Sequence, residues 1–155
     1  MIGQAKVLTV SDSVQRGSRE DRSGPELVAA LRAHGFEVIQ HDVVGDGVES
    51  VATALSGMCA QFWGLVVTTG GTGFSPRDLT PEATRQVIDR EAPGLAEAMR
   101  GRNPLGRLTR GVAGTFGTCL VVNLPGSTRG AIESIDSIID VLPHVLELLG
   151  GRSAH

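Results

Sequence analysis

The sequence predicts an α/β protein: a single three-layer α/β/α domain over residues 1–155, with helices on both faces of a mostly parallel β-sheet. Two observations predict this class. Short apolar runs alternate along the chain with segments of helical periodicity, which is the rhythm of right-handed β-α-β crossovers. The run Trp63–Thr69 (WGLVVTT) is also too uniformly apolar for a strand with one wet face, as expected at the centre of a parallel sheet.

The N-terminal part of the chain predicts a strand, a loop and a helix. Lys6–Val10 (KVLTV) is rich in β-branched residues, and Ser11–Arg22 is a polar loop. Ser23 stands two residues before a proline and three before a glutamate, which is the pattern of a capping box with Ser23 as N-cap. The helix that follows is expected over residues 24–34, and Gly35 ends it.

The next segments predict a second strand, a helix and a third strand. Phe36–Val44 alternates and then becomes apolar, and the tripeptide Gly45–Gly47 breaks it. Apolar residues then recur at helical spacing over residues 48–61, with an inner face made of Val51, Leu55 and Met58. Trp63–Thr69 is the third strand.

The second half of the chain predicts helices, a long loop and a fourth strand. Thr80 is a suitable N-cap, with Pro81 at the first helical position, for a helix that reaches Arg90. A second short helix is expected over Pro93–Arg100, and Gly101–Gly117 predicts a loop with at most one short turn. Thr118–Leu124 is the fourth core strand. After Ser127 the apolar residues keep helical spacing to Leu149, and Pro143 kinks or splits this last helix.

Composition excludes several classes of protein. A formal net charge of −3 without a basic stripe argues against nucleic-acid binding, and 3% aromatic residues argue against a stacking platform for single strands. No apolar run is long enough for a membrane span and the N-terminus reads as a strand, so we expect a cytoplasmic protein with no membrane partner. Lys6 is the only lysine, which excludes a Schiff-base or phosphate-loop lysine elsewhere. Cys59 and Cys119 are expected to be buried reduced thiols.

Candidate functional residues follow the carboxyl ends of the predicted strands, where ligands bind in sheets of this kind. Four segments meet at this rim: residues 11–22, 45–47, 70–79 and 125–128. In Gly70–Gly73 (GGTG) a tight turn lacks bulky side chains, so backbone N–H groups can approach an anion and Thr72 can add a hydroxyl; a plain turn is the alternative. The motif matches neither the lysine-containing phosphate loop nor the G-x-G-x-x-G of dinucleotide-binding folds.

Besides the Gly70–Gly73 turn, the rim carries the carboxylates of Asp12, Asp46 and Asp78, with Asp21 and Glu82 nearby. Ionised carboxylates would repel a bound phosphate unless a divalent cation lay between them, and Mg²⁺ accepts one or two carboxylates while it bridges to phosphate oxygens. The alternative is structural, with Asp12 and Asp46 completing turns and Asp78 paired with Arg77.

A second turn at the rim offers further donors to phosphate. Ser127 and Thr128 follow Pro125-Gly126 at the end of the fourth strand, where N–H and hydroxyl groups are available. Arg129 or Arg110 can supply the positive charge that lysine cannot, or either one is solvated.

Six stretches, in this order along the chain, carry a resemblance to a known family: LTVSDS (8–13), DRSGP (21–25), DVVGD (42–46), TTGGTGFSPRDLTPEA (68–83), LTRGVAG (108–114) and VNLPGS (122–127). They extend over nearly the whole chain, and the long central motif is highly specific. On these residues the chain resembles the molybdopterin adenylyltransferase family, of the MogA/MoaB type.

The resemblance implies a Mg²⁺- and ATP-dependent transfer of AMP to the terminal phosphate of molybdopterin, with release of pyrophosphate, in molybdenum cofactor biosynthesis. It implies that Asp46 and Asp78 are catalytic, and we expect both to position the metal. It also implies a homotrimer and, as a further partner, the molybdenum-inserting protein of the pathway. The residues expected to bind substrate and nucleotide are Ser11, Asp12, Ser23, Gly70, Gly71, Thr72, Gly73, Ser75, Pro125, Gly126, Ser127 and Thr128.

The sequence departs from the family pattern in two places, and two other functions compete. Gly45 precedes Asp46 where the family commonly has proline, and the segment between Gly94 and Leu108 is shorter than expected. The main alternative function is a protein that binds molybdopterin or its adenylate and passes it on without catalysis. The other is a different nucleotide-dependent enzyme on the same scaffold, such as the related N-terminal domain of competence/damage-inducible proteins.

Overall fold

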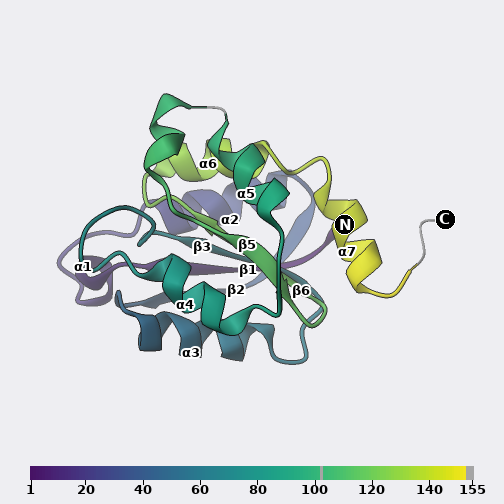
Figure 1. Ribbon diagram of the computed structural model, residues 1–155, viewed down its shortest axis with the longest axis horizontal. Helices are drawn as coiled ribbons and strands as arrows, with labels where there is room; N and C mark the ends of the chain where they lie inside the picture. The colour runs from purple at the N-terminus through teal and green to yellow at the C-terminus, as the bar shows by residue number, and fades with distance from the viewer. Residues whose placement is uncertain (102, 153–155) are drawn as a thin grey trace.

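A six-stranded sheet lies between two layers of helices (Figure 1) in the computed structural model, which describes residues 1–101 and 103–152. The strand order is β2-β1-β3-β6-β5-β4. The parallel part of the sheet is formed by β1 (Gly3–Val10), β2 (Phe36–Val44), β3 (Gly64–Thr69) and β6 (Cys119–Leu124). At one edge two antiparallel strands follow, β5 (Ala113–Phe116) and β4 (Arg90–Glu91). The predicted α/β class with a mostly parallel sheet is therefore confirmed.

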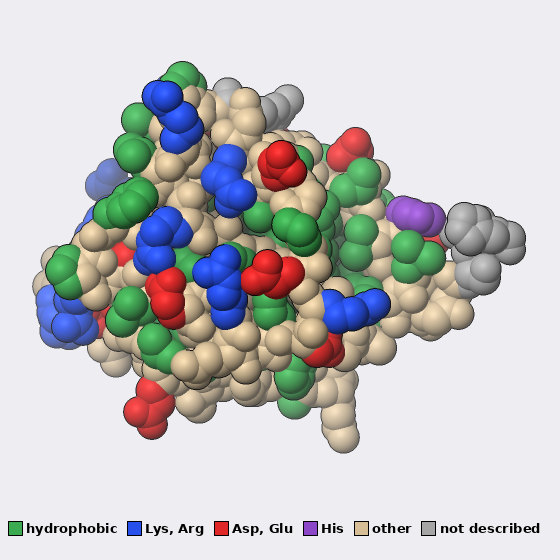
Figure 2. Space-filling view, in the orientation of Figure 1, with side chains coloured by type: hydrophobic (Ala, Val, Ile, Leu, Met, Phe, Trp, Pro, Cys, Tyr) green, Lys and Arg blue, Asp and Glu red, His purple; other side chains and the backbone are tan. Residues whose placement is uncertain are grey.

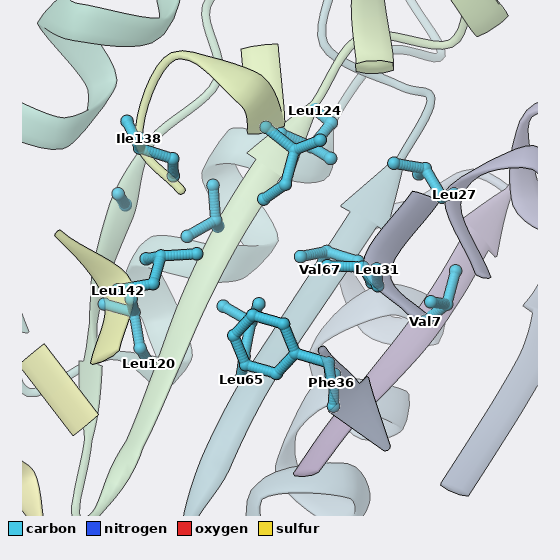
Figure 3. Close-up of a cluster of buried hydrophobic side chains, with 14 of the residues drawn as sticks. Val7, Leu27, Leu31, Phe36, Leu65, Val67, Leu120, Leu124, Ile138 and Leu142 are labelled. Atoms are coloured by element: carbon cyan, nitrogen blue, oxygen red, sulfur yellow. The ribbon is translucent and has the colours of Figure 1, made fainter. Parts of the chain in front are cut away.

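Each face of the sheet carries its own hydrophobic cluster. One face is covered by four helices, α2 (Ser23–Ala33), α5 (Pro93–Arg100), α6 (Thr128–Asp136) and α7 (Leu142–Leu149). Between these helices and the strands, Leu31, Leu65 and Leu120 are fully buried (Figure 3). The opposite face is covered by α3 (Val48–Cys59) and α4 (Thr80–Val87), and the predicted inner residues of α3 are buried there. Because helices cover both faces, every residue of β3 is buried between β1 and β6.

Two helix starts differ from the prediction. Helix α2 begins at Ser23 itself, and the Glu26 N–H, which a Ser23 cap would accept, donates to Arg22 O at 3.3 Å instead. The hydroxyls of Ser23 and Thr69 are hydrogen-bonded to each other at 3.0 Å. Helix α4 likewise begins at Thr80, whose buried hydroxyl donates to Gly70 O at 3.0 Å. Both hydroxyls predicted to cap helices thus bind these helices to the end of β3.

Several short elements were not predicted. Within the expected loop 11–22, Asp12–Gln15 forms helix α1, whose N-cap is Ser11. The helix expected to reach Arg90 ends at Val87, and the next residues pair with β5 as β4. The segment 101–117, expected to be a loop, contains the 3-10 helix η1 (Pro104–Leu108) and β5. β5 has the sequence Ala-Gly-Thr-Phe, which is too short to carry a periodic signal.

The last predicted helix is split into α6 and α7, which is one of the two expected outcomes. α6 ends at Asp136, and α7 begins at Leu142 with Pro143 in its first turn. A proline is tolerated there because the first N–H groups of a helix have no partner within it. The break therefore precedes the proline.

The described residues also bear on three expectations from composition. Cys59 and Cys119 are buried free thiols, as predicted, with 3.3 Å between their Sγ atoms. None of the helices in the described part of the chain combines the length and apolar character needed to cross a membrane. On the face shown in Figure 2, basic and acidic side chains lie next to one another, so this face has no patch of one charge.

Asn123 in β6 joins three parts of the fold, and its replacement tests how much the buried polar network contributes to stability. Its Nδ2 donates to the hydroxyls of Thr68 and Thr84 at 3.1 and 2.9 Å, and its Oδ1 accepts the Val112 N–H at 3.2 Å. Asn123→Leu leaves these groups without their partner, so we expect the free energy of unfolding to fall by at least about 1–3 kcal/mol in urea denaturation. The control is Gln86→Leu, at an exposed amide on α4, with an expected change within about 0.5 kcal/mol. Equal losses in the two variants would contradict the prediction.

Candidate functional site

The ends of β1, β3 and β6 converge at the carboxyl rim of the sheet, at the left of the view in Figure 1, where α1 follows β1. Gly70, the first residue after β3, donates its N–H to Leu124 O at 3.1 Å. Gly70 has a φ of +104°, and a Cβ at this position would lie 2.2 Å from Val10 O. Position 70 therefore requires glycine, because any side chain would separate the three strand ends.

The segment that follows Gly70 is folded back onto the rim by its own hydrogen bonds. The Thr80 N–H donates to Gly71 O at 3.1 Å, which closes the segment at the start of α4. Within it, the Ser75 N–H donates to Asp78 Oδ2 at 3.0 Å and the Asp78 N–H donates to Ser75 O at 2.9 Å. These bonds fix the Asp78 carboxylate at the far end of the glycine turn.

Asp12 and Asp46 are joined by two hydrogen bonds, each from the backbone N–H of one residue to the carboxylate of the other. The Asp12 N–H donates to Asp46 Oδ2, and the Asp46 N–H donates to Asp12 Oδ1, both at 3.0 Å. Asp12 also forms an ion pair with Arg77, whose guanidinium lowers the pKa of Asp12. The structural alternative in which Arg77 pairs with Asp78 is therefore wrong, since the arginine pairs with Asp12.

The surroundings of Asp46 destabilise the ionised form of its carboxyl group relative to the protonated form. Burial raises its pKa, and the neighbouring carboxylates of Asp12 and Asp78 raise it further, against the lowering effect of the Asp12 N–H. Within the described residues, no group of three or more His, Cys, Asp or Glu is placed to hold a metal ion. Two carboxylates are sufficient for Mg²⁺, which takes its other ligands from water and substrate phosphates. Asp46 and Asp78 therefore fit such an ion, whose charge would offset their repulsion.

Gly45, where the family commonly has proline, is explained by the same pair. A Cβ at this position would lie 2.9 Å from Asp12 Oδ1, the atom that accepts the Asp46 N–H. Glycine leaves room for that oxygen. The hydrogen bonds with Asp12 hold Asp46 in place although glycine has a freer backbone than proline.

Two cavities adjoin across a ridge formed by Gly71, Asp78, Gly126 and Ser127, which line both of them. The first cavity, of about 590 Å³, lies between this ridge, η1 and α6. The second, of about 560 Å³, lies between the ridge and the segments that follow β1. Both volumes are typical of sites for small molecules.

Twelve of the fourteen predicted site residues line a cavity. Besides the four on the ridge, the first cavity is lined by Thr72, Gly73 and Pro125. The second cavity is lined by Ser11, Ser23, Asp46, Gly70 and Thr128. The remaining two are Asp12, which holds Asp46, and Ser75, which is exposed and whose N–H binds Asp78.

The outer walls of both cavities were not predicted. The first cavity is closed by residues of α5, η1 and α6, among them Met99, Asn103, Leu105, Leu108 and Glu133. Leu105 and Leu108 are 69% and 56% exposed, and two leucines in a segment rich in glycine and arginine were the available signal. The second cavity is lined by Arg19 and Arg22, in the segment predicted only as a polar loop.

The two arginines considered for phosphate binding both have protein partners. Arg129 lines the first cavity, but its Nε donates to Glu133 Oε1 at 2.8 Å. Arg110 is not among the residues that line either cavity, and its guanidinium instead contacts Gly73, Asp78 and Glu82.

Residues 6–144 match the model of the family described as "Probable molybdopterin binding domain". The chain is 34% identical to the molybdopterin adenylyltransferase of Helicobacter pylori strain J99, in a match that covers 94% of this chain and 87% of that protein. It is 33% identical to gephyrin of Dictyostelium discoideum over 94% of this chain, but it spans only 22% of that protein. The crystal structure of the molybdopterin biosynthesis enzyme MoaB from Thermus thermophilus has a TM-score of 0.89 at 42% identity, over 98% of this chain and 99% of that one.

The environment of Asp46 predicts that its charge reduces stability. A raised pKa means that the folded chain binds the proton more readily than the unfolded chain, so this contribution to stability is present in acid and is lost as the pH rises through the folded pKa. Asp46→Asn removes the charge but keeps an oxygen to accept the Asp12 N–H. We therefore expect a higher Tm than wild type at pH 7, and a difference that vanishes below the ordinary pKa of aspartate, about 3.9. Thermal unfolding across this pH range measures both effects.

The control for this prediction is Asp42→Asn, at an exposed aspartate on β2. It should not raise the Tm at pH 7. A similar rise in both variants would show that net charge, and not the surroundings of Asp46, is responsible.

Proposed function

The chain belongs to this molybdopterin-binding family, and we propose that it is a molybdopterin adenylyltransferase, which transfers AMP from Mg-ATP to the terminal phosphate of molybdopterin and releases pyrophosphate. The observation that carries the proposal is the pair of adjoining cavities that share Asp78 and Gly71. A reaction between two anionic substrates needs two binding sites that meet at one point, and the ridge is such a point. The Helicobacter pylori relative is named for this activity.

The same proposal includes the cellular setting that the family resemblance implies. In it, residues 1–155 act as one domain in the cytoplasm, and the protein forms a homotrimer. The adenylated pterin then passes to the molybdenum-inserting protein of the pathway.

In the proposed reaction an oxygen of the terminal phosphate of molybdopterin attacks the α-phosphorus of ATP. The new bond joins that oxygen to the phosphorus, the bond from the phosphorus to the bridging oxygen breaks, and pyrophosphate leaves with the electron pair. The second pKa of a phosphate monoester is about 6, so the nucleophile is already ionised near neutral pH and needs no strong base. The contribution of the protein is alignment and stabilisation of charge.

Backbone groups on the ridge suit both phosphates. Gly71 and Gly73 have no side chain to keep a phosphate away from the N–H groups of the turn. α6 begins at Thr128 directly after the ridge residue Ser127, and the positive end of a helix favours an anion. Asp46 and Asp78 would hold Mg²⁺, which when bound supplies positive charge to the phosphates and to the departing pyrophosphate.

The decisive experiment incubates the purified protein with Mg-ATP and molybdopterin and measures pyrophosphate and the adenylated pterin together. An adenylyltransferase forms both products in equal amounts. A carrier protein binds molybdopterin without releasing pyrophosphate. Nucleotide turnover that molybdopterin neither supports nor competes with would indicate a different nucleotide-dependent enzyme. Either of the last two results would overturn the proposal.

Asp78→Asn tests the role of the carboxylate on the ridge. An asparagine oxygen can still accept the Ser75 N–H, so we expect an unchanged unfolding midpoint. We expect kcat to fall by at least about a hundredfold, because the negative charge that positions the cation is lost. Pyrophosphate release at saturating Mg²⁺ and ATP measures kcat, and the control is Asp140→Asn, at an exposed aspartate outside both cavities. Wild-type turnover in Asp78→Asn would exclude this role.

A further inference from the structure

We propose that Arg110 is a positioning residue that holds the segment Gly73–Asp78 in the shape that places the Asp78 carboxylate on the ridge. Arg110 lies in the chain between η1 and β5 and does not line either cavity. Its influence on the reaction is therefore indirect. The activity readouts below rest on the proposed function, whereas the readout of backbone order does not.

Arg110 binds the segment at both of its ends. Its backbone N–H donates to Thr72 O at 2.8 Å, and its Nε donates to Gly73 O at 2.8 Å. On the far side of the turn, Nη2 donates to Asp78 O at 2.6 Å. One residue therefore binds the carbonyl group of the last residue of the glycine turn and the carbonyl group of Asp78 on the ridge.

Glu82, in the first turn of α4, orients this guanidinium. Nη1 donates to Glu82 Oε2 at 2.8 Å and Nη2 donates to Glu82 Oε1 at 3.1 Å, and this bidentate pair lowers the pKa of Glu82. Two carbonyl groups and one carboxylate thus surround a single planar group with donors in fixed directions. A lysine has one nitrogen on a flexible stem and cannot reproduce this arrangement.

The segment depends on Arg110 because its other described link to the rim is the ion pair of Arg77, an exposed side chain, with Asp12. Phe74 is 69% exposed, and residues 75–77 are exposed as well, so the segment buries little apolar surface. Its internal bonds join Ser75 to Asp78 but do not reach Thr72 or Gly73, whose carbonyl groups are bound by Arg110. Segments with few buried contacts open at low free energy, and a displacement of about 1 Å in a catalytic group can cost about a hundredfold in rate.

The experiment compares Arg110→Lys and Arg110→Gln with the wild-type protein. We expect kcat for pyrophosphate release to fall by about a hundredfold, while the KM values for ATP and molybdopterin stay within about twofold. In Arg110→Gly, added ethylguanidine should restore part of kcat, because the lost group is planar and bidentate. A rise in KM at unchanged kcat would make Arg110 a substrate-binding group, and full kcat in Arg110→Lys would exclude a need for the guanidinium; either result overturns the proposal.

The matched control is Arg107→Gln. Arg107 is an exposed arginine three residues earlier, whose Nε donates to Pro104 O within η1. We expect its kcat and KM to equal those of wild type. A loss of kcat equal to that of Arg110→Gln would show that any lost arginine charge in this segment has the same effect, which would overturn the proposal.

A second readout, hydrogen exchange of the Ser75 amide by NMR, does not depend on turnover. This N–H donates to the Asp78 carboxylate, so its exchange reports the shape of the segment. We expect exchange to rise about tenfold in Arg110→Gln and in Glu82→Gln, at an unchanged unfolding midpoint, and to stay unchanged in Arg107→Gln. Faster exchange in a protein that forms no adenylate would refute the proposed function but support the positioning role. Unchanged exchange in a protein that does form the adenylate would support the proposed function but refute the positioning role.

Discussion

The close approach of three strand ends at Gly70 is the constraint on which the site depends. The Gly70 N–H binds the end of β6, and its Cα lies against the carbonyl oxygen of Val10 at the end of β1. Because the strands end so close together, the turns that follow β3 and β6 lie side by side and form one ridge. Two hydroxyl groups add hydrogen bonds close to Gly70. The Thr69 hydroxyl joins β3 to Ser23 of α2, and the Thr80 hydroxyl joins the start of α4 to Gly70 O. Helices on both faces of the sheet are thus anchored where the ligands would bind.

The second constraint is electrostatic, and it acts against stability. Burial and two neighbouring carboxylates disfavour the charge of Asp46, while hydrogen bonds with Asp12 keep it in that place. A fold selected only for stability would not retain such a group, and destabilising charges of this kind are typical of functional sites. Arg77 pairs with Asp12, and in the proposed function Mg²⁺ would balance the carboxylates of Asp46 and Asp78.

Much of the fold could be predicted because the central strands are largely apolar runs and the main helices have apolar residues at helical spacing. β4, β5 and η1 could not, because they are short and depend on tertiary contacts such as the bond from the Val112 N–H to Asn123. The inner lining of the cavities was predictable, since it comes from glycine, hydroxyl and carboxylate residues directly after strands. The outer walls come from α5, α6 and η1, and their arrangement follows from packing, of which a single sequence carries little sign. Ser23 and Thr80 illustrate the same limit: a hydroxyl in a capping pattern can instead bind a neighbouring strand.

The distribution of positive charge favours a metal-dependent transfer. Arg77 pairs with Asp12, Arg110 with Glu82, and Arg129 with Glu133, so each of these three arginines beside the ridge is matched by a carboxylate. Lys6 lies on β1 and donates to Met58 O, at the end of α3. Arg19 and Arg22 line the second cavity but not the first. None of the four residues that form the ridge carries a positive charge. Two phosphates that meet there would repel each other and the carboxylates of Asp46 and Asp78 at short range in a site of reduced dielectric. A carrier that bound one phosphate could avoid this repulsion by keeping its ligand in one cavity, whereas a transferase must bring both phosphates to the ridge and therefore needs the ion.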